Sequence, residues 1–173
     1  VVISRDDIEI LKDKGVTAVH NPTSNMKLGS GFMPMRSLLD AGVPVVLGAD
    51  STASNNNLNF LEEMHLASLI HCGIGRDPTL VKAGEILTMA TSAGAEAQGR
   101  KDTGKLKIGN RADLAIFDLD KPHLIPVHDA PALIVYAAQA SDIVYTIADG
   151  KIIYDHGEYL TIDAEKAKAS FLK

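Results

Sequence analysis

The chain has 173 residues, of which 46% are hydrophobic and 23% charged, and this composition excludes an intrinsically disordered protein. Its net charge of -5 excludes the basic surface with which proteins bind nucleic acid or an anionic membrane, so we expect neither partner. No apolar run reaches the ~20 residues of a membrane-spanning helix. The single cysteine, Cys72, cannot form an internal disulfide, which predicts a reducing compartment and hence a cytoplasmic protein.

The first predicted elements are a helix and a short strand. Ser4 and Asp7 have the spacing of a capping box, which starts a helix, and Gly15 ends it. Residues 16–19 form a β-branched strand that leads into His20. Asn21-Pro22 then stops the strand, because proline cannot continue the pairing.

A second helix and strand follow. Pro34 predicts the start of a helix and Gly42 its end. Residues 43–47 are almost uninterruptedly apolar, which is typical of a strand buried on both faces. A polar loop over 51–57 precedes an apolar helix that begins near Leu58. Two strand–helix units in succession predict a parallel sheet in an α/β fold.

The character of the chain changes near residue 103. Residues 79–98 have a helical pattern, whereas Asp149-Gly150 between two apolar runs predicts a β-hairpin. A terminal helix capped by Asp163 is expected to run to Lys173. We therefore predict two domains, an α/β unit over 1–103 and a mainly-β unit over 104–173.

The parallel sheet is too small to stand alone. Two strands do not make a stable sheet, and a complete (β/α)8 barrel takes ~250 residues. We therefore expect the chain to be the C-terminal part of a longer protein. The alternative is a compact domain whose remaining strands are not evident in the sequence.

Three polar residues follow the strands at the sheet edge where ligands bind in α/β proteins. Asp50 can bind a metal, act as a general acid or base, or cap the next turn of backbone. His20 can contact a ligand or substrate, or hold the Asn-Pro loop through a hydrogen bond. Ser54 can touch substrate or cap the helix near Leu58. The residues alone leave these alternatives open.

The remaining polar residues carry weaker signals. His65 and His71 are six apart, not at the i,i+4 spacing of a helical metal pair, so we expect them to pack or to lie on a helix surface. Cys72 is expected to pack. The sequence contains no G-x-G-x-x-G after a strand, no P-loop and no G-x-S-x-G motif.

Two segments resemble the amidohydrolase superfamily: residues 19–31 (VHNPTSNMKLGSG) and 42–56 (GVPVVLGADSTASNN). Within it they are similar to the branch that holds methylthioadenosine/S-adenosylhomocysteine deaminases, guanine deaminases and triazine chlorohydrolases. Residues 104–114 (GKLKIGNRADL) and 149–151 (DGK) carry the resemblance into the C-terminal part.

The resemblance implies the last part of a (β/α)8 TIM-like barrel, with strands 7 and 8 at 16–19 and 43–47, followed by a small β-sandwich unit. Asp50 matches the strand-eight aspartate that holds the catalytic metal and moves a proton between the attacking water and the leaving group. Ser54 matches a position that meets substrate. His20 matches the histidine of an HNP motif, which on this resemblance shapes the site.

The implied function is a metal-dependent aminohydrolase that removes an amino group from a small purine-like or other heterocyclic substrate. The implied cofactor is one divalent metal, Zn²⁺ or alternatively Fe²⁺. Because a catalytic metal site has at least three protein ligands, the others must lie upstream in the missing N-terminal part, and this segment alone is expected to be inactive. The alternatives are a chlorohydrolase or cyclic-amide hydrolase of the same fold, or a non-catalytic relative. A homo-oligomer is a further expectation.

Overall fold

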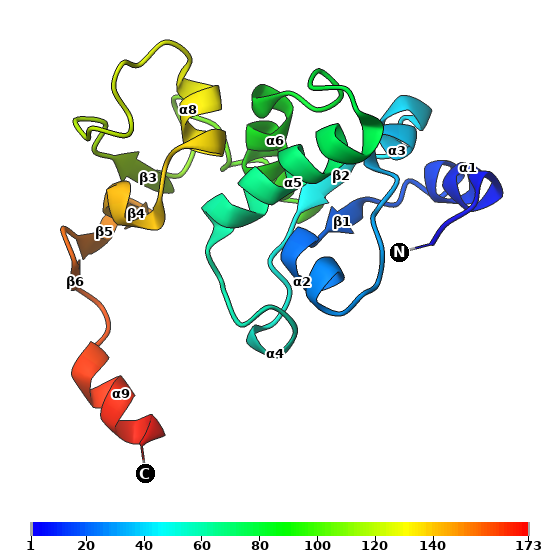
Figure 1. Cartoon of the computed structure of the whole chain (residues 1–173). Helices are drawn as coiled ribbons and strands as arrows, with labels where there is room; N and C mark the ends of the chain where they lie inside the picture. The colour runs from blue at the N-terminus through cyan, green and yellow to red at the C-terminus, as the bar shows by residue number, and fades with distance from the viewer. Residues whose placement is uncertain (1, 173) are drawn as a thin grey trace.

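The computed structural model describes residues 2–172, which form a parallel sheet packed against helices and a separate antiparallel sheet (Figure 1). Helices α1 to α7 span, in order, Arg5–Asp13, Pro22–Lys27, Met35–Ala41, Thr52–Asn55, Phe60–Gly75, Ala83–Ala90 and Ser92–Ala97. Helix α8, the 3₁₀ turn η1 and helix α9 span Ala130–Tyr136, Ala140–Asp142 and Ala164–Phe171. Strands β1 to β6 span Ala18–His20, Val45–Leu47, Leu114–Phe117, Ile143–Ala148, Lys151–Asp155 and Glu158–Tyr159.

The predicted parallel sheet is confirmed. β1 pairs with β2 in parallel, so that His20 lies opposite Leu47 at the carboxyl ends of both strands. Each strand begins two residues later than the sequence predicted. The polar residues that follow β1 and β2 therefore start from the same edge of the sheet.

A single core packs the parallel strands against the helices. Its buried members are aliphatic or methionine side chains: Ile8, Met33, Met35, Leu38, Val43, Val45, Leu47, Leu61, Met64, Ala67, Val81, Ile86, Met89 and Val135. Helices α3, α6 and α7 all contact β2, which buries its three residues. Burial on both faces explains why this strand is continuously apolar in the sequence.

Several local signals give the structure they predict. Ser4 and Asp7 form both bonds of the capping box, at 3.1 Å from the Asp7 N–H to Ser4 Oγ and 2.7 Å from the Ser4 N–H to Asp7 Oδ2. Gly42 ends α3 with a left-handed φ of 86°. Asp149 and Gly150, both with positive φ, turn the hairpin between β4 and β5.

Three expectations need correction. The predicted polar loop over 51–57 contains the one-turn helix α4, and Pro22 begins α2 rather than only ending β1. Proline fits the first helical position because its missing N–H has no intrahelical partner there. The helical pattern over 79–98 is two helices, α6 and α7, separated at Thr91, where the backbone leaves the helical region.

The C-terminal part is an antiparallel sheet with the strand order β3-β4-β5-β6. Pairing changes from parallel to antiparallel between β2 and β3, but the division into domains at residue 103 stays a prediction. Beyond β6, helix α9 extends away from the body of the molecule (Figure 1). Asp163 caps it as predicted, accepting the N–H of Lys166 at 2.9 Å, although Lys173 lies outside the described residues. None of the helices within residues 2–172 has the length and apolar character needed to cross a membrane.

Candidate functional site

Asp50 lies three residues beyond β2, and its carboxylate is held from two sides. Ser24 Oγ donates to Oδ2 at 2.6 Å, and the N–H of Ser51 donates to Oδ1 at 2.7 Å. The residue is exposed and has a φ of 60°, in the left-handed region that non-glycine residues seldom adopt. The two donors fix the direction of the carboxylate.

The same contacts keep Asp50 charged. The hydroxyl of Ser24 lowers the pKa of its carboxyl most, followed by the hydroxyl of Ser54 and the N–H of Ser51. Each carboxylate oxygen still has a lone pair for another partner. Asp50 contacts the N–H of Ser51 but does not cap α4, whose N-cap is Ser51 and which receives no side-chain cap bond. The role of Asp50 as a metal ligand or a base stays a prediction.

Ser54 lies beside Asp50 in helix α4. Its Oγ contacts the carbonyl and the hydroxyl of Ser51, both at 3.2 Å. The alternative that Ser54 caps the next helix is wrong, because Asn59 caps α5 by accepting the N–H of Leu61 at 3.2 Å. Whether Ser54 meets a substrate stays a prediction.

His20 is only 2% exposed, and its ring faces α5 rather than the Asn-Pro loop. Its Nε2 lies 3.0 Å from Nε2 of His71, while its Nδ1 is buried without a hydrogen-bond partner among the described residues. Burial lowers the pKa of His20 to about 4, with a smaller contribution from His71, and burial also lowers the pKa of His71. Both rings are thus neutral near pH 7, and one donates to the other.

Two of the buried polar residues that escaped the sequence analysis contact the segments around Asp50. Glu63, on α5, is 1% exposed, and Asn55, at the end of α4, is 4% exposed. Glu63 Oε1 accepts from Asn55 Nδ2 at 2.7 Å, and Oε2 accepts the N–H of Thr23 at 3.1 Å. The second hydrogen of Asn55 Nδ2 binds the carbonyl of Ala49 at 2.6 Å. These bonds join the segments that follow the two parallel strands.

Gly48 allows the two strand ends to approach each other. A Cβ at this position would lie 2.8 Å from Val19 Cγ1 and closer still to Asn21 Oδ1. We expect Gly48→Ala to lower the free energy of unfolding by about 1–3 kcal/mol, because it overpacks this contact. Urea denaturation of the intact protein measures the change.

The matched control for that substitution is Gly84→Ala. Gly84 is exposed on α6, and a Cβ there meets nothing within 4 Å. Alanine also has the higher helix propensity, so we expect no loss of stability and a gain of up to ~1 kcal/mol. An equal loss of stability in both variants would contradict the close approach at Gly48.

The described residues contain no group of three or more His, Cys, Asp or Glu side chains placed to hold a metal ion. Asp50 nevertheless suits one position in such a site, because it is charged, exposed and oriented. Hard and borderline divalent metals accept carboxylate oxygen as a ligand. The carboxylate of Asp50 therefore fits one ligand position of a metal site.

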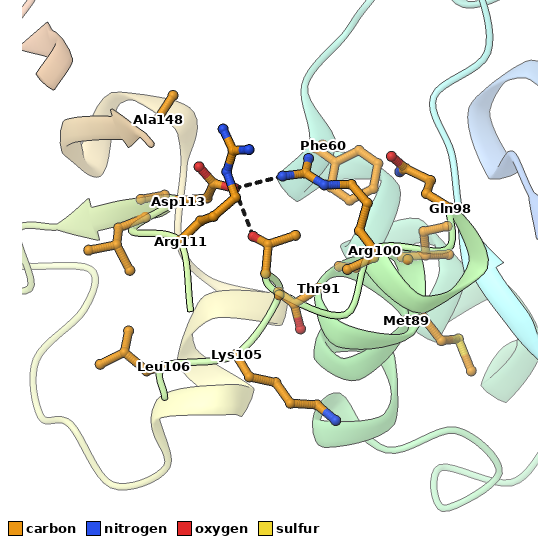
Figure 2. Close-up of a pocket in the computed structure, with 18 of the residues that line it drawn as sticks. Phe60, Met89, Thr91, Gln98, Arg100, Lys105, Leu106, Arg111, Asp113 and Ala148 are labelled. Atoms are coloured by element: carbon orange, nitrogen blue, oxygen red, sulfur yellow. Dashed lines mark hydrogen bonds and ion pairs between the residues drawn. The ribbon is translucent and has the colours of Figure 1, made fainter. Parts of the chain in front are cut away.

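A pocket of about 810 Å³ lies between helices α6 and α7 and the segment that leads into β3 (Figure 2). On its wall Asp113 accepts from the N–H of Asp149 at 2.7 Å and from Thr103 Oγ1 at 2.8 Å, and it pairs with Arg100 at 3.3 Å. These partners, Asp149 foremost, lower the pKa of Asp113. None of the predicted site residues lines this pocket. The cluster ties the chain after α7 to the β-hairpin.

The chain has close relatives of known activity. It is 50% identical over 169 residues to the 5-methylthioadenosine/S-adenosylhomocysteine deaminase of Acetivibrio thermocellus, covering 97% of this chain and 39% of the relative. It is 46% identical over 166 residues to the 5'-deoxyadenosine deaminase of Methanosarcina acetivorans, covering 96% of this chain and 38% of the relative. The chain thus spans about two fifths of the length of these proteins.

Solved structures have the same fold. A zinc-bound adenosine deaminase from Xanthomonas campestris superposes with a TM-score of 0.92 at 32% identity, covering 97% of this chain and 38% of that one. A zinc complex of the atrazine chlorohydrolase of Arthrobacter aurescens TC1 gives 0.92 at 31% identity, covering 99% and 38%. Residues 1–153 match the Amidohydrolase family. The chain therefore belongs to the amidohydrolase family.

Proposed function

We propose that this chain is the last part of a metal-dependent aminohydrolase that removes the amino group of an adenine-type nucleoside. The observation that carries the proposal is the carboxylate of Asp50, fixed by Ser24 and Ser51 beyond the end of β2. It occurs in a chain that is half identical to a methylthioadenosine/S-adenosylhomocysteine deaminase. In the reaction, water replaces the amino group on the purine ring, and ammonia leaves.

The fold proposal is more specific than the family. β1 and β2 would be strands 7 and 8 of a (β/α)8 barrel, and β3 to β6 part of a β-sandwich. The parallel pairing of β1 with β2, and the packing of α3, α6 and α7 against β2, support this assignment. The remaining strands and metal ligands would come from the rest of a longer protein.

Asp50 has two roles in this proposal. As a ligand, it would help to hold zinc, or alternatively iron, which when bound brings the pKa of the attacking water toward neutrality. As a base, its carboxylate would accept a proton from that water and deliver it to the departing amine. Both roles require a charged carboxylate near neutral pH; the hydrogen bonds that lower the pKa of Asp50 favour the ligand role, since a lower pKa also makes the group a weaker base.

Ser54 and His20 would act on the substrate side of the site. Ser54 is half-buried and lies beside the carboxylate of Asp50, where its hydroxyl can reach a polar group of the substrate. His20 is buried, so its contribution would be to shape the pocket through the segment that follows β1.

A chlorohydrolase is the second candidate, because the atrazine chlorohydrolase matches the chain with the same TM-score as the adenosine deaminase. The leaving group separates the two. We expect the intact protein, loaded with zinc, to release ammonia from 5'-methylthioadenosine and no chloride from atrazine. Chloride without ammonia would favour the chlorohydrolase. Neither product, together with a native protein that holds no metal, would favour a non-catalytic relative.

A further inference from the structure

The contacts around Asp50 close into a ring. The hydroxyl of Ser24 donates to Asp50 at 2.6 Å. The N–H of Thr23, the residue before Ser24, donates to Glu63 at 3.1 Å. Glu63 binds Asn55 at 2.7 Å, and Asn55 holds the carbonyl of Ala49, the residue before Asp50, at 2.6 Å. Both arms of the ring start at Glu63 and end at Asp50.

We propose that Glu63 is a positioning residue that sets the location of the Asp50 carboxylate. It does not touch the site itself, since it is buried on α5 and acts through Asn55 on one side and the Thr23–Ser24 segment on the other. This inference rests on the proposed function of Asp50. The inference adds that metal binding and turnover depend on the buried carboxylate of Glu63 as well as on the exposed carboxylate of Asp50.

Both carboxylate oxygens of Glu63 must accept hydrogen bonds, because each of them faces an N–H donor. One oxygen faces the amide hydrogens of Asn55, and the other faces a backbone N–H in the first turn of α2. That turn receives no side-chain cap from Asn21, so Glu63 satisfies an amide that the helix itself leaves open. Within residues 2–172 Glu63 takes part in no ion pair, and these donors are what compensate its burial.

Asp50 needs such support because its backbone conformation is unfavourable. Its φ of 60° lies in the left-handed region, whose cost must be met by contacts that fix the segment. Asn55 supplies one of them, because one hydrogen of its amide binds the carbonyl of Ala49 while the other binds Glu63. Glu63 therefore orients Asn55, and Asn55 orients the backbone that carries Asp50.

The decisive substitution is Glu63→Gln in the intact protein. Glutamine has the same size but replaces one acceptor by an NH₂ group, which would face a donor and open one arm of the ring. We expect the zinc affinity, measured by competition with a chelator, to fall by about 10–100-fold. We expect kcat to fall by a similar factor, with KM changed by less than about threefold, because no substrate contact is removed.

The control is Glu96→Gln, which makes the same charge change at an exposed position on α7 and should alter neither quantity. A purely structural Glu63 would change the melting temperature but leave zinc affinity and kcat at the control level. That result would overturn the inference.

A second variant keeps the test decisive if Glu63→Gln fails to fold. Asn55→Ala removes the amide donor to both Glu63 and the carbonyl of Ala49 without placing a second carboxylate beside the buried Glu63, and it should reduce zinc affinity and kcat in the same way. Where both variants fold, zinc affinity and kcat of the double variant should be no lower than those of the more impaired single variant, because both substitutions break the same ring of contacts. Losses that multiply would contradict a shared path.

The outcome for Asp50→Asn separates this inference from the proposed function. If Asp50→Asn stays active, the proposed function fails. If Asp50→Asn is inactive while Glu63→Gln and Asn55→Ala bind zinc and turn over as the control does, only the inference about Glu63 fails.

Discussion

Replacing Asp50 by asparagine is expected to lower kcat of the intact protein by about 10³-fold, within the 10²–10⁴ range of general acid–base catalysis. Asparagine occupies the same volume and can still accept one of the two bonds from Ser24 and Ser51. It has no negative charge, however, so it cannot take a proton from water, and it is a poor ligand for a divalent metal. Steady-state kinetics of ammonia release measures the loss.

The fold should survive this substitution. Asp50 is exposed and packs against no core residue, so we expect the urea midpoint to move by less than that of Gly48→Ala. Asp13→Asn, at an exposed position in the last turn of α1, is the matched control and should retain wild-type kcat. An Asp50→Asn variant within about threefold of the control would refute the role of this carboxylate.

The features that could be predicted from the sequence are those whose cause is local. The Ser4–Asp7 capping box and the Asp149-Gly150 turn depend on residues at most three positions apart, and both are present. The buried strand β2 follows from the continuous apolar run alone. Asp50 was found because polar residues after such strands lie at the edge where ligands bind.

The features that could not be predicted are contacts between distant segments. The partner of His71 is His20, 51 residues away, whereas its spacing from His65 suggested only packing or a position on the helix surface. Glu63 resembles an ordinary acidic residue in the first turn of a helix until its contact with Thr23, 40 residues away, is known. A polar side chain becomes informative once the fold shows which donors it faces.

Short helices were also beyond the sequence. α4 has four residues rich in Ser, Thr and Asn, which favour turns as much as helix starts, and a single turn leaves no periodicity to detect. Helix α8 was not expected either, although Asp129 caps it by accepting the N–H of Ala132 at 2.9 Å. Tertiary packing, rather than propensity, decides whether elements of this length form.

The buried pair His20–His71 predicts a loss of stability in mild acid. The pKa of His20 is about 4 in the folded protein and near its ordinary value of 6.5 in the unfolded chain. Between these two values the unfolded chain binds a proton that the folded protein does not, so stability falls as the pH falls and is constant above about 6.5. Over this window the loss for His20 is about 3 kcal/mol, and the lowered pKa of His71 adds to it in the same direction.

The measurement is the free energy of unfolding in urea for wild type and His20→Gln, from pH ~7 to pH ~4.5. Glutamine can still bond to His71 but does not titrate, so the variant should lose less stability than wild type as the pH falls. Carboxylates such as Asp50 and Asp113 have a pKa below the ordinary 3.8 and therefore contribute mainly below this window. The exposed His128→Gln is the matched control and should follow wild type. Parallel curves for wild type and His20→Gln would mean that His20 is not held neutral in the folded protein, and His20 would then have no part in the acid sensitivity.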